Sequence, residues 1–278
     1  MANDSGPNAP AYAQRPGATG RAATRKVYTS GDFNRGILEE RTHRPWPMPA
    51  RPWIMTQTWH DLLFAHWPLA PEVLGHRIPG PVQLDLFDGR AWIGIVSFYM
   101  TNVAARWTPA LPGVSAFPEV NVRTYVRVAD QPGVFFFSLD AGSRLAVWAA
   151  RWALNLPYYF ASMTVETFAS DTEYRSSRAA QAEWVAGYRP AGPVFHASPG
   201  SLEYFLTERY ALYALDRSGR PYRLQIHHPP WPLQAAEAEI ARNTMAEAAG
   251  LALADTAPLL HFSKRQDMVA WPPERIGR

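Results

Sequence analysis

One polar face of a strongly β-forming stretch carries the residues best suited to chemistry. In PEVNVRTYVRV, successive side chains of a strand point to opposite faces, so Glu119, Asn121 and Arg123 share one face. The other face holds valine and threonine. A carboxylate beside a guanidinium can bind and orient an oxo or carboxylate group where the pair lines a cavity. On an ordinary sheet the same face would be solvated, or would hold an ion pair along the strand.

The pair His227-His228 ends a second alternating run, just before two prolines. The two rings point to opposite faces of a strand, so they cannot bind one metal ion together. His228 shares its face with apolar residues, which predicts a core position. His227 shares its face with Arg223 and Gln225, which suits solvent or a polar cavity wall. Because imidazole titrates near neutral pH, His227 is a candidate acid-base group and His228 a candidate substrate contact.

Metal and cofactor chemistry are not expected. The chain has no cysteine, and its eight histidines show no HxH, HxxxH or HExxH spacing. Ser201 lacks the glycines of a nucleophile elbow and is more typical of a helix cap. We therefore predict no metal site and no bound cofactor.

The positive charge of the chain is concentrated near its N-terminus. The net charge is +3 and the pI about 9.2, but residues 1–51 hold 8 basic against 4 acidic residues. The rest of the chain is close to neutral. A nucleic-acid reader carries its basic surface on the folded domain, so that class is excluded.

Two regions of the sequence differ in amino-acid composition. Residues 1–49 are rich in Pro, Gly, Ala and Arg without an apolar period, which predicts a disordered basic tail. Residues 50–278 are dense in apolar and aromatic residues and predict a single domain with a sizeable core. We find neither a secretory signal nor an apolar run of about 20 residues, so we expect a cytoplasmic protein without a membrane partner.

The predicted elements are mostly strands. Asp88-Gly89 between alternating runs predicts a tight hairpin, and a second hairpin is expected around Gly219. Ser143 is the expected cap of a helix with Leu145, Trp148, Trp152 and Leu156 near one side. A second helix is expected over 233–249. The class is α+β, mostly antiparallel, with enough strand to close into a barrel-like sheet.

Several segments, in order along the chain, resemble the YqjF-like family, domain of unknown function 2071. The resemblance runs from about Arg51 to Trp271. It rests on RPWIMTQTWHDLLFAHWPL, LDLFDGRAWIGIVSFYM, FPEVNVRTYV, FFFSLDA, LPYYFASM, PGSLEYFLTERYALYA, HHPPWPLQ and LLHF. That family is similar to the acetoacetate decarboxylase-like fold, a closed, cone-shaped β-barrel with a central cavity.

The resemblance carries expectations about single residues. In the decarboxylases a lysine after a helix forms a Schiff base with the substrate, and a strand glutamate assists. ALNLPYY resembles that helix-to-strand element and FPEVNV the glutamate strand. Tyr158 and Tyr159 then take the lysine positions and Glu119 the glutamate position. The only lysines are Lys26 and Lys264, both elsewhere, so Schiff-base chemistry is not expected.

We predict a small-molecule protein with an internal cavity whose ligand is an oxo or carboxylic acid. A homo-oligomer is compatible with the sequence. As an enzyme it would use Glu119 as acid, base or polar anchor, Arg123 as anion clamp, and Tyr158 and His227 as hydrogen-bonding groups. The alternatives are a non-catalytic ligand binder or sensor with the same cavity, and an interaction protein that acts through its tail.

Overall fold

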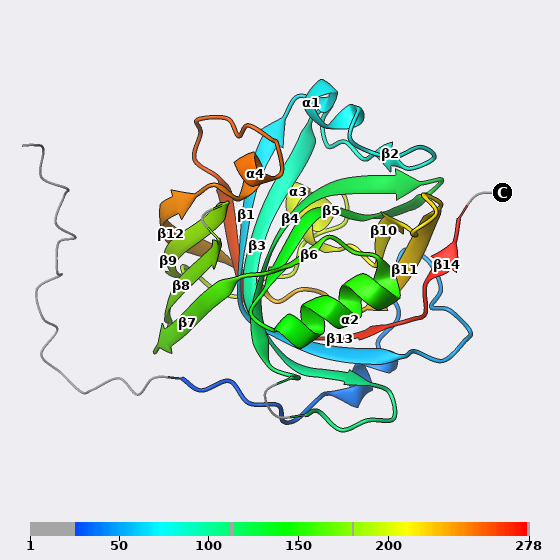
Figure 1. Ribbon diagram of the computed structural model, residues 1–278, viewed down its shortest axis with the longest axis horizontal. Coiled ribbons are helices and arrows are strands. Elements are labelled where there is room, and N and C mark those ends of the chain that lie inside the picture. The colour runs from blue at the N-terminus through cyan, green and yellow to red at the C-terminus, as the bar shows by residue number, and fades with distance from the viewer. Residues whose placement is uncertain (1–25, 112–113, 180, 277–278) are drawn as a thin grey trace, which may run out of the picture.

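The structure is a computed structural model that describes residues 26–111, 114–179 and 181–276, and it consists mainly of strands (Figure 1). No described helix is long and apolar enough to cross a membrane. The helices are η1 Arg35–Leu38, α1 Pro71–Gly75, α2 Arg144–Leu154, α3 Leu202–Thr207 and α4 Met245–Ala248. The strands are β1 Met55–Leu69, β2 Gln83–Leu84, β3 Ala91–Ala105, β4 Phe117–Val128, β5 Gln131–Ala141, β6 Tyr158–Phe160, β7 Ser162–Phe168, β8 Asp171–Arg178, β9 Ala182–Pro190, β10 Ala211–Leu215, β11 Pro221–His227, β12 Leu233–Asn243, β13 Leu259–Ala270 and β14 Glu274–Arg275.

The strands join in one extended sheet whose order departs from the order of the chain. That order is β14-β11-β10-β5-β4-β3-β1-β13-β12-β9-β8-β7. The pairs are antiparallel apart from β5 with β10 and β5 with β6, which are parallel, so the described sheet is mixed. Strand β11 pairs with β10 and also, through Ile226 and His227, with β13. The strand-rich class with mostly antiparallel pairs is confirmed.

Strand β4 has one face in the hydrophobic core and the other toward helix α2. On one face, Val120 and Val122 are fully buried in a core that also contains Tyr174 of β8 and Trp184 of β9. The opposite face of β4 looks toward α2, which lies over the front of the sheet in Figure 1. The alternation predicted for this strand is confirmed. It directs the valines into the core and the polar residues to the α2 side.

The prediction of a second main helix over residues 233–249 is wrong. These residues form strand β12 and the one-turn helix α4. Along β12, Ala236, Ala238 and Ile240 pack on the core, and the residues between them are exposed. Alanine and glutamate favour helices. Here the two-residue period and the pairing with β9 and β13 override that preference.

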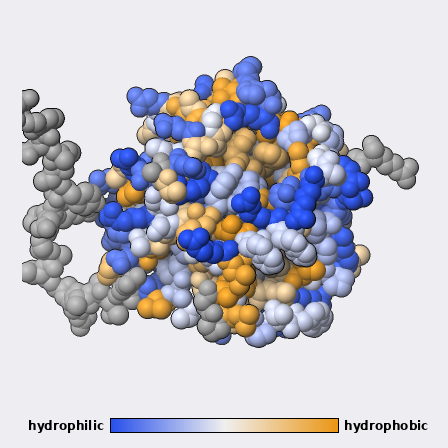
Figure 2. All heavy atoms as spheres, viewed as in Figure 1, coloured by the Kyte–Doolittle hydropathy of each residue, from blue (hydrophilic) through white to orange (hydrophobic). Residues whose placement is uncertain are grey.

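Helix α2 begins after its predicted cap, Ser143, whose hydroxyl accepts a backbone hydrogen bond. The predicted apolar side is wrong, because Leu145, Trp148 and Trp152 are 53%, 62% and 65% exposed. The buried residue of the helix is Val147. The side of the helix toward the sheet is formed mostly by alanines, with Leu145 and Leu154 at its two ends, and the two tryptophans lie outside. Figure 2 shows apolar and polar residues interspersed on this face of the molecule.

The first predicted hairpin is reduced to its turn. Asp88 and Gly89 have φ of 48° and 74°, as an Asp-Gly turn requires, and Phe87 bridges Arg90. Strand β2, however, pairs with β4 rather than with β3. The second predicted hairpin, β10 with β11 around Gly219, is confirmed.

Residues 26–49, which the sequence assigns to a disordered tail, lie against the sheet. Ile37 in η1 is 2% exposed and belongs to a core cluster with Val269 and Trp271. This part of the expected tail is therefore ordered, because isolated apolar anchors without a period still find partners in β13. The remainder, residues 1–25, lies outside the described residues.

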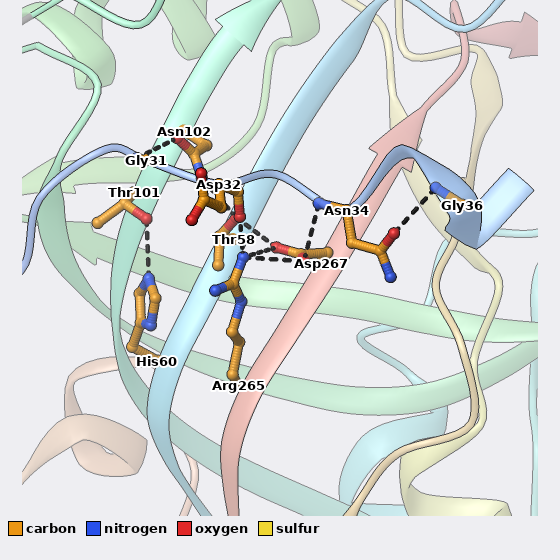
Figure 3. A network of polar contacts seen from close by, with 10 residues as sticks. All are labelled: Gly31, Asp32, Asn34, Gly36, Thr58, His60, Thr101, Asn102, Arg265 and Asp267. Atoms are coloured by element: carbon orange, nitrogen blue, oxygen red, sulfur yellow. Dashed lines mark hydrogen bonds and ion pairs between the residues drawn. The ribbon is translucent and has the colours of Figure 1, made fainter.

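Hydrogen bonds fix the same segment across β1, β3 and β13 (Figure 3). Gly31 donates its backbone N–H to Oδ1 of Asn102 on β3 over 3.0 Å, and Asn34 donates to Oδ2 of Asp267 on β13 over 3.3 Å. Thr58 of β1 links the two acceptors: it accepts from Asn102 Nδ2 at 2.9 Å and donates to Asp267 Oδ1 at 2.5 Å. These bonds attach two exposed residues of the segment, Gly31 and Asn34, to buried polar side chains of the sheet.

Truncation of Ile37 tests whether this segment contributes to stability. We expect Ile37→Ala to lower the free energy of unfolding by about 2–4 kcal/mol, because it removes a buried side chain. Val27→Ala is the control, since Val27 is 76% exposed, and it should change stability by less than about 0.5 kcal/mol. Urea unfolding followed by circular dichroism measures both. Equal effects of the two substitutions would contradict the packing.

Candidate functional site

A cavity of about 370 Å³ lies between the inner face of the sheet and helix α2. Its wall is largely apolar and comes from β1, β3, β4, β5, β10, β11 and α2. Ala149 and Ala153 of α2 both line the cavity and are exposed, so the cavity opens to solvent beside this helix. The volume falls within the range of about 300–1,000 Å³ that small-molecule sites occupy.

Glu119 of β4 lies on the cavity wall and is only 3% exposed. Its Oε2 accepts a hydrogen bond from the hydroxyl of Tyr158 at 2.8 Å, and its Oε1 accepts one from Asn121 Nδ2 at 3.1 Å. Burial raises the pKa of Glu119 to about 7, against the lowering effect of these two bonds. A carboxyl group with this pKa can both take up and release a proton near neutral pH.

The two adjacent tyrosines point in opposite directions, as expected for a strand. Strand β6 runs parallel to β5 and places Tyr158 beside Leu139, on the cavity wall. Tyr159 is 40% exposed and lies under the guanidinium of Arg178, 4.1 Å from the ring centre. Burial and the neighbouring Glu119 raise the pKa of Tyr158 well above its usual value, so its hydroxyl stays a neutral donor.

Arg123 and Asn121 also line the cavity. Arg123 is half-buried and donates to the backbone oxygen of Leu206 at 3.4 Å. Its guanidinium lies 5.5 Å from the ring centre of Phe64 and 5.8 Å from that of Tyr125. Among the described residues Arg123 forms no ion pair, and its Nε and the Oδ1 of Asn121 have no hydrogen-bond partner. Both side chains therefore offer unused polar atoms at the wall.

Arg209 is a cavity residue that the sequence analysis did not identify. It is 6% exposed, binds Asp85 at 2.6 Å and lies 5.1 Å from the ring centre of Tyr125. It falls between α3 and β10, where no strand or helix period assigns its direction. The one available signal is an arginine directly before the apolar run YALYAL.

The two histidines lie in other surroundings than their strand faces predicted, although the place of His228 agrees with its role as a candidate substrate contact. His228 lines the cavity, together with Leu224 and Ile226 from the same face. That face resembles a core in sequence because the cavity wall itself is apolar. His227 is buried against the N-terminal segment, with its Nε2 2.7 Å from the backbone oxygen of Ile37. Its expected place on a polar cavity wall is wrong.

Burial keeps both imidazoles neutral at physiological pH. It lowers the pKa of His227 to about 4 and that of His228 to about 3. The predicted acid-base group of the pair, His227, therefore neither borders the cavity nor titrates near neutral pH. His228 remains available as a neutral hydrogen-bonding group at the wall.

The lysines of the chain meet away from the cavity, at one buried carboxylate. Lys26 Nζ lies 2.9 Å from Oδ2 of Asp61, and Lys264 Nζ lies 2.5 Å from its Oδ1. Asp61 has a φ of 46° at an irregular point of β1 and is 1% exposed. Neither lysine belongs to the cavity wall. Among the described residues, no group of three or more His, Asp or Glu side chains is arranged to hold a metal ion.

Solved structures share this arrangement of strands at low sequence identity. The enduracididine biosynthesis enzyme MppR complexed with pyruvate has a TM-score of 0.56 and 11% identity, over 83% of this chain and 92% of that one. An acetoacetate decarboxylase-like enzyme from Sphingomonas wittichii RW1 has 0.56 and 13%, over 85% and 98%. Acetoacetate decarboxylase from Legionella pneumophila has 0.56 and 11%, over 89% and 98%. The chain therefore has an acetoacetate decarboxylase-like fold.

Sequence comparison assigns the family. The protein YqjF of Bacillus subtilis (strain 168), described as uncharacterized, is 48% identical over 222 residues, which cover 79% of this chain and 91% of YqjF. Residues 56–267 match the family DUF2071, described as an uncharacterized conserved protein. This span includes every residue of the cavity wall named above. The resemblance noted in the sequence is thereby confirmed, and the chain belongs to the DUF2071 family of YqjF-like proteins.

Proposed function

We propose that the protein binds an oxo or carboxylic acid in its cavity and transfers a proton on that ligand through Glu119 and Tyr158. The observation that carries the proposal is the state of Glu119. It is buried at the cavity wall, forms no ion pair within the described residues, and has a pKa raised to about 7. Such a carboxyl group is matched to acid-base catalysis at neutral pH.

The reaction class that fits this pair is proton transfer at a carbon next to an oxo group. Ionised Glu119 takes the proton from that carbon, and the electron pair of the broken C–H bond moves onto the oxo oxygen. Tyr158 has one hydroxyl proton, so on ligand binding its hydrogen bond shifts from Glu119 to the oxygen, where the negative charge develops. The protonated Glu119 exchanges its proton with solvent and returns one to the carbon, so in deuterated water the turnover is the replacement of C–H by C–D. Arg123 binds the carboxylate of the ligand, and Asn121 and His228 contact it.

The choice of an oxo acid has support from a relative in fold. MppR is a protein of this fold in complex with pyruvate, which is an oxo acid. A Schiff base with the ligand is not part of the proposal, because both lysines of this chain bind Asp61 instead. We also propose that the cavity lies inside a closed barrel, and the pairing of β11 with both β10 and β13 supports this.

A non-catalytic binder or sensor is the second candidate. The largely apolar wall favours it, because such a wall holds a ligand without contributing to a reaction. The two candidates differ in one observable. Both predict stabilisation by ligand, but an enzyme also yields product.

Proton NMR of the protein mixed with small oxo acids and aromatic acids tests the enzymatic candidate. We expect turnover, and we expect Glu119→Gln to reduce it by about 10²–10⁴-fold while the fold is retained. Tyr158→Phe should also reduce turnover, whereas Tyr159→Phe, its exposed neighbour, should not. Ligand line broadening without product would favour the binder. Equal effects of the two tyrosine substitutions would contradict the role of Tyr158.

The pH dependence of stability tests the state of Glu119 without a ligand. A glutamate ionises near pH 4.5 in the unfolded chain and near pH 7 in the folded protein, so stability falls as pH rises between these values. The decrease amounts to about 3 kcal/mol. Urea unfolding should show the stability of Glu119→Gln rising relative to wild type from pH 4.5 to pH 7. Asp140, with a pKa raised to about 6, contributes to both proteins and cancels. A difference independent of pH would contradict the raised pKa.

A further inference from the structure

Two separate sets of side chains in the cavity carry its acid and its positive charge. Glu119 and Tyr158 form one, which we call the acid end. Arg123 and Arg209, which lie against the buried ring of Tyr125, form the other, which we call the cation end. Both sets belong to the face of β4 that looks into the cavity or to elements packed against it.

The two ends are far apart on the scale of a small ligand. Glu119 and Arg123 are four residues apart in one strand, which corresponds to about 13 Å between their backbones. The guanidinium of Arg123 does not shorten this separation. It lies near Tyr125, one step further along the same face, and donates to Leu206 of α3. A ligand that contacts both ends must therefore be long.

The cation end has an excess of positive charge. Arg209 is paired with Asp85, but Arg123 has no acidic partner in the described part of the chain. His66, which shares a 2.6 Å hydrogen bond with Tyr125, is held neutral because burial lowers its pKa well below the usual value. A partly buried guanidinium without a counter-charge is costly, and a ligand carboxylate offsets that cost.

Most of the wall between the ends is apolar, with Asn121 as a polar residue within it. The apolar lining residues include Phe64, Val96, Phe136, Leu139 and Leu212. Burial of a hydrocarbon chain against such a wall contributes about 0.8 kcal/mol per CH₂ group. A short 2-oxo acid would leave this wall uncovered and would reach only one of the two ends.

We infer that the ligand of this cavity is an amphipathic oxo acid in which a hydrocarbon chain separates the carboxylate from the oxo group. The carboxylate binds Arg123 at the cation end, the chain lies along the apolar wall, and the oxo group meets Glu119 and Tyr158. This inference rests on the proposed function and narrows its ligand class.

Two isomers separate the ligand classes on the wild-type protein. 2-Oxodecanoic acid and 9-oxodecanoic acid have the same composition and differ in the distance between their carboxylate and oxo groups. Calorimetric titration should give a Kd for the 9-oxo isomer at least about tenfold lower. Equal values, or tighter binding of the 2-oxo isomer, would overturn the inference and leave the proposed function standing. Absence of saturable binding by either isomer and by decanoic acid would overturn both.

Variants assign the two ends of the ligand. Arg123→Met should raise the Kd of 9-oxodecanoic acid at least about tenfold, and Arg127→Met, an exposed position of the same strand, should not. Tyr158→Phe should weaken 9-oxodecanoic acid but leave decanoic acid unchanged, because only the former has an oxo group. Circular dichroism confirms folding of each variant. A uniform effect of Tyr158→Phe on both acids would refute the assignment of the acid end.

Discussion

The two-residue period of β4 is the constraint on which the site depends. Val120 and Val122 are fully buried in the core shared with β8 and β9, so they cannot exchange faces with their neighbours. A slip by one residue would bury Glu119 and Arg123 in that core and expose the valines to the cavity. The energy of the core therefore fixes the direction of the polar residues, although none of the core residues touches the cavity.

The same arrangement makes Glu119 unusual. A buried carboxylate is normally offset by a cation or by several donors. Here two neutral donors, the hydroxyl of Tyr158 and the amide of Asn121, compensate burial only in part, and the pKa stays raised. The position of Tyr158 follows from β6, a three-residue strand held parallel to β5 after α2. Helix α2 thus borders the cavity and leads directly into the strand that holds Tyr158 against Glu119.

The direction of a side chain could be predicted from the sequence where the residue belongs to a regular alternation of apolar and polar residues. The alternation of β4 and the opposed directions of Tyr158 and Tyr159 follow from strand geometry, and the structure bears them out. The same alternation predicted a core position for His228, because a strand face that lines an apolar cavity has the same residue pattern as a face that packs in a core. Arg209 lies outside any period.

Composition misled the prediction in other places. In β12, alternating alanine and glutamate satisfy a helix by propensity and a strand by period, and only pairing with β9 and β13 decides between them. Residues 26–49 have the composition of a disordered segment, yet single anchors such as Ile37 and long-range hydrogen bonds order them. No short window of sequence contains the partners of these contacts.

The raised pKa of Glu119 depends on the neutral hydroxyl of Tyr158 as its neighbour. A lysine in place of Tyr158 would put a cation against Glu119 and hold its carboxyl group ionised. A neutral hydroxyl supplies a hydrogen bond without a charge, so burial dominates and the proton is held to about pH 7. The lysines of the chain meanwhile neutralise Asp61 at a distance from the cavity. The pKa of Glu119 is therefore set by burial and by a neutral hydroxyl rather than by a nearby cation.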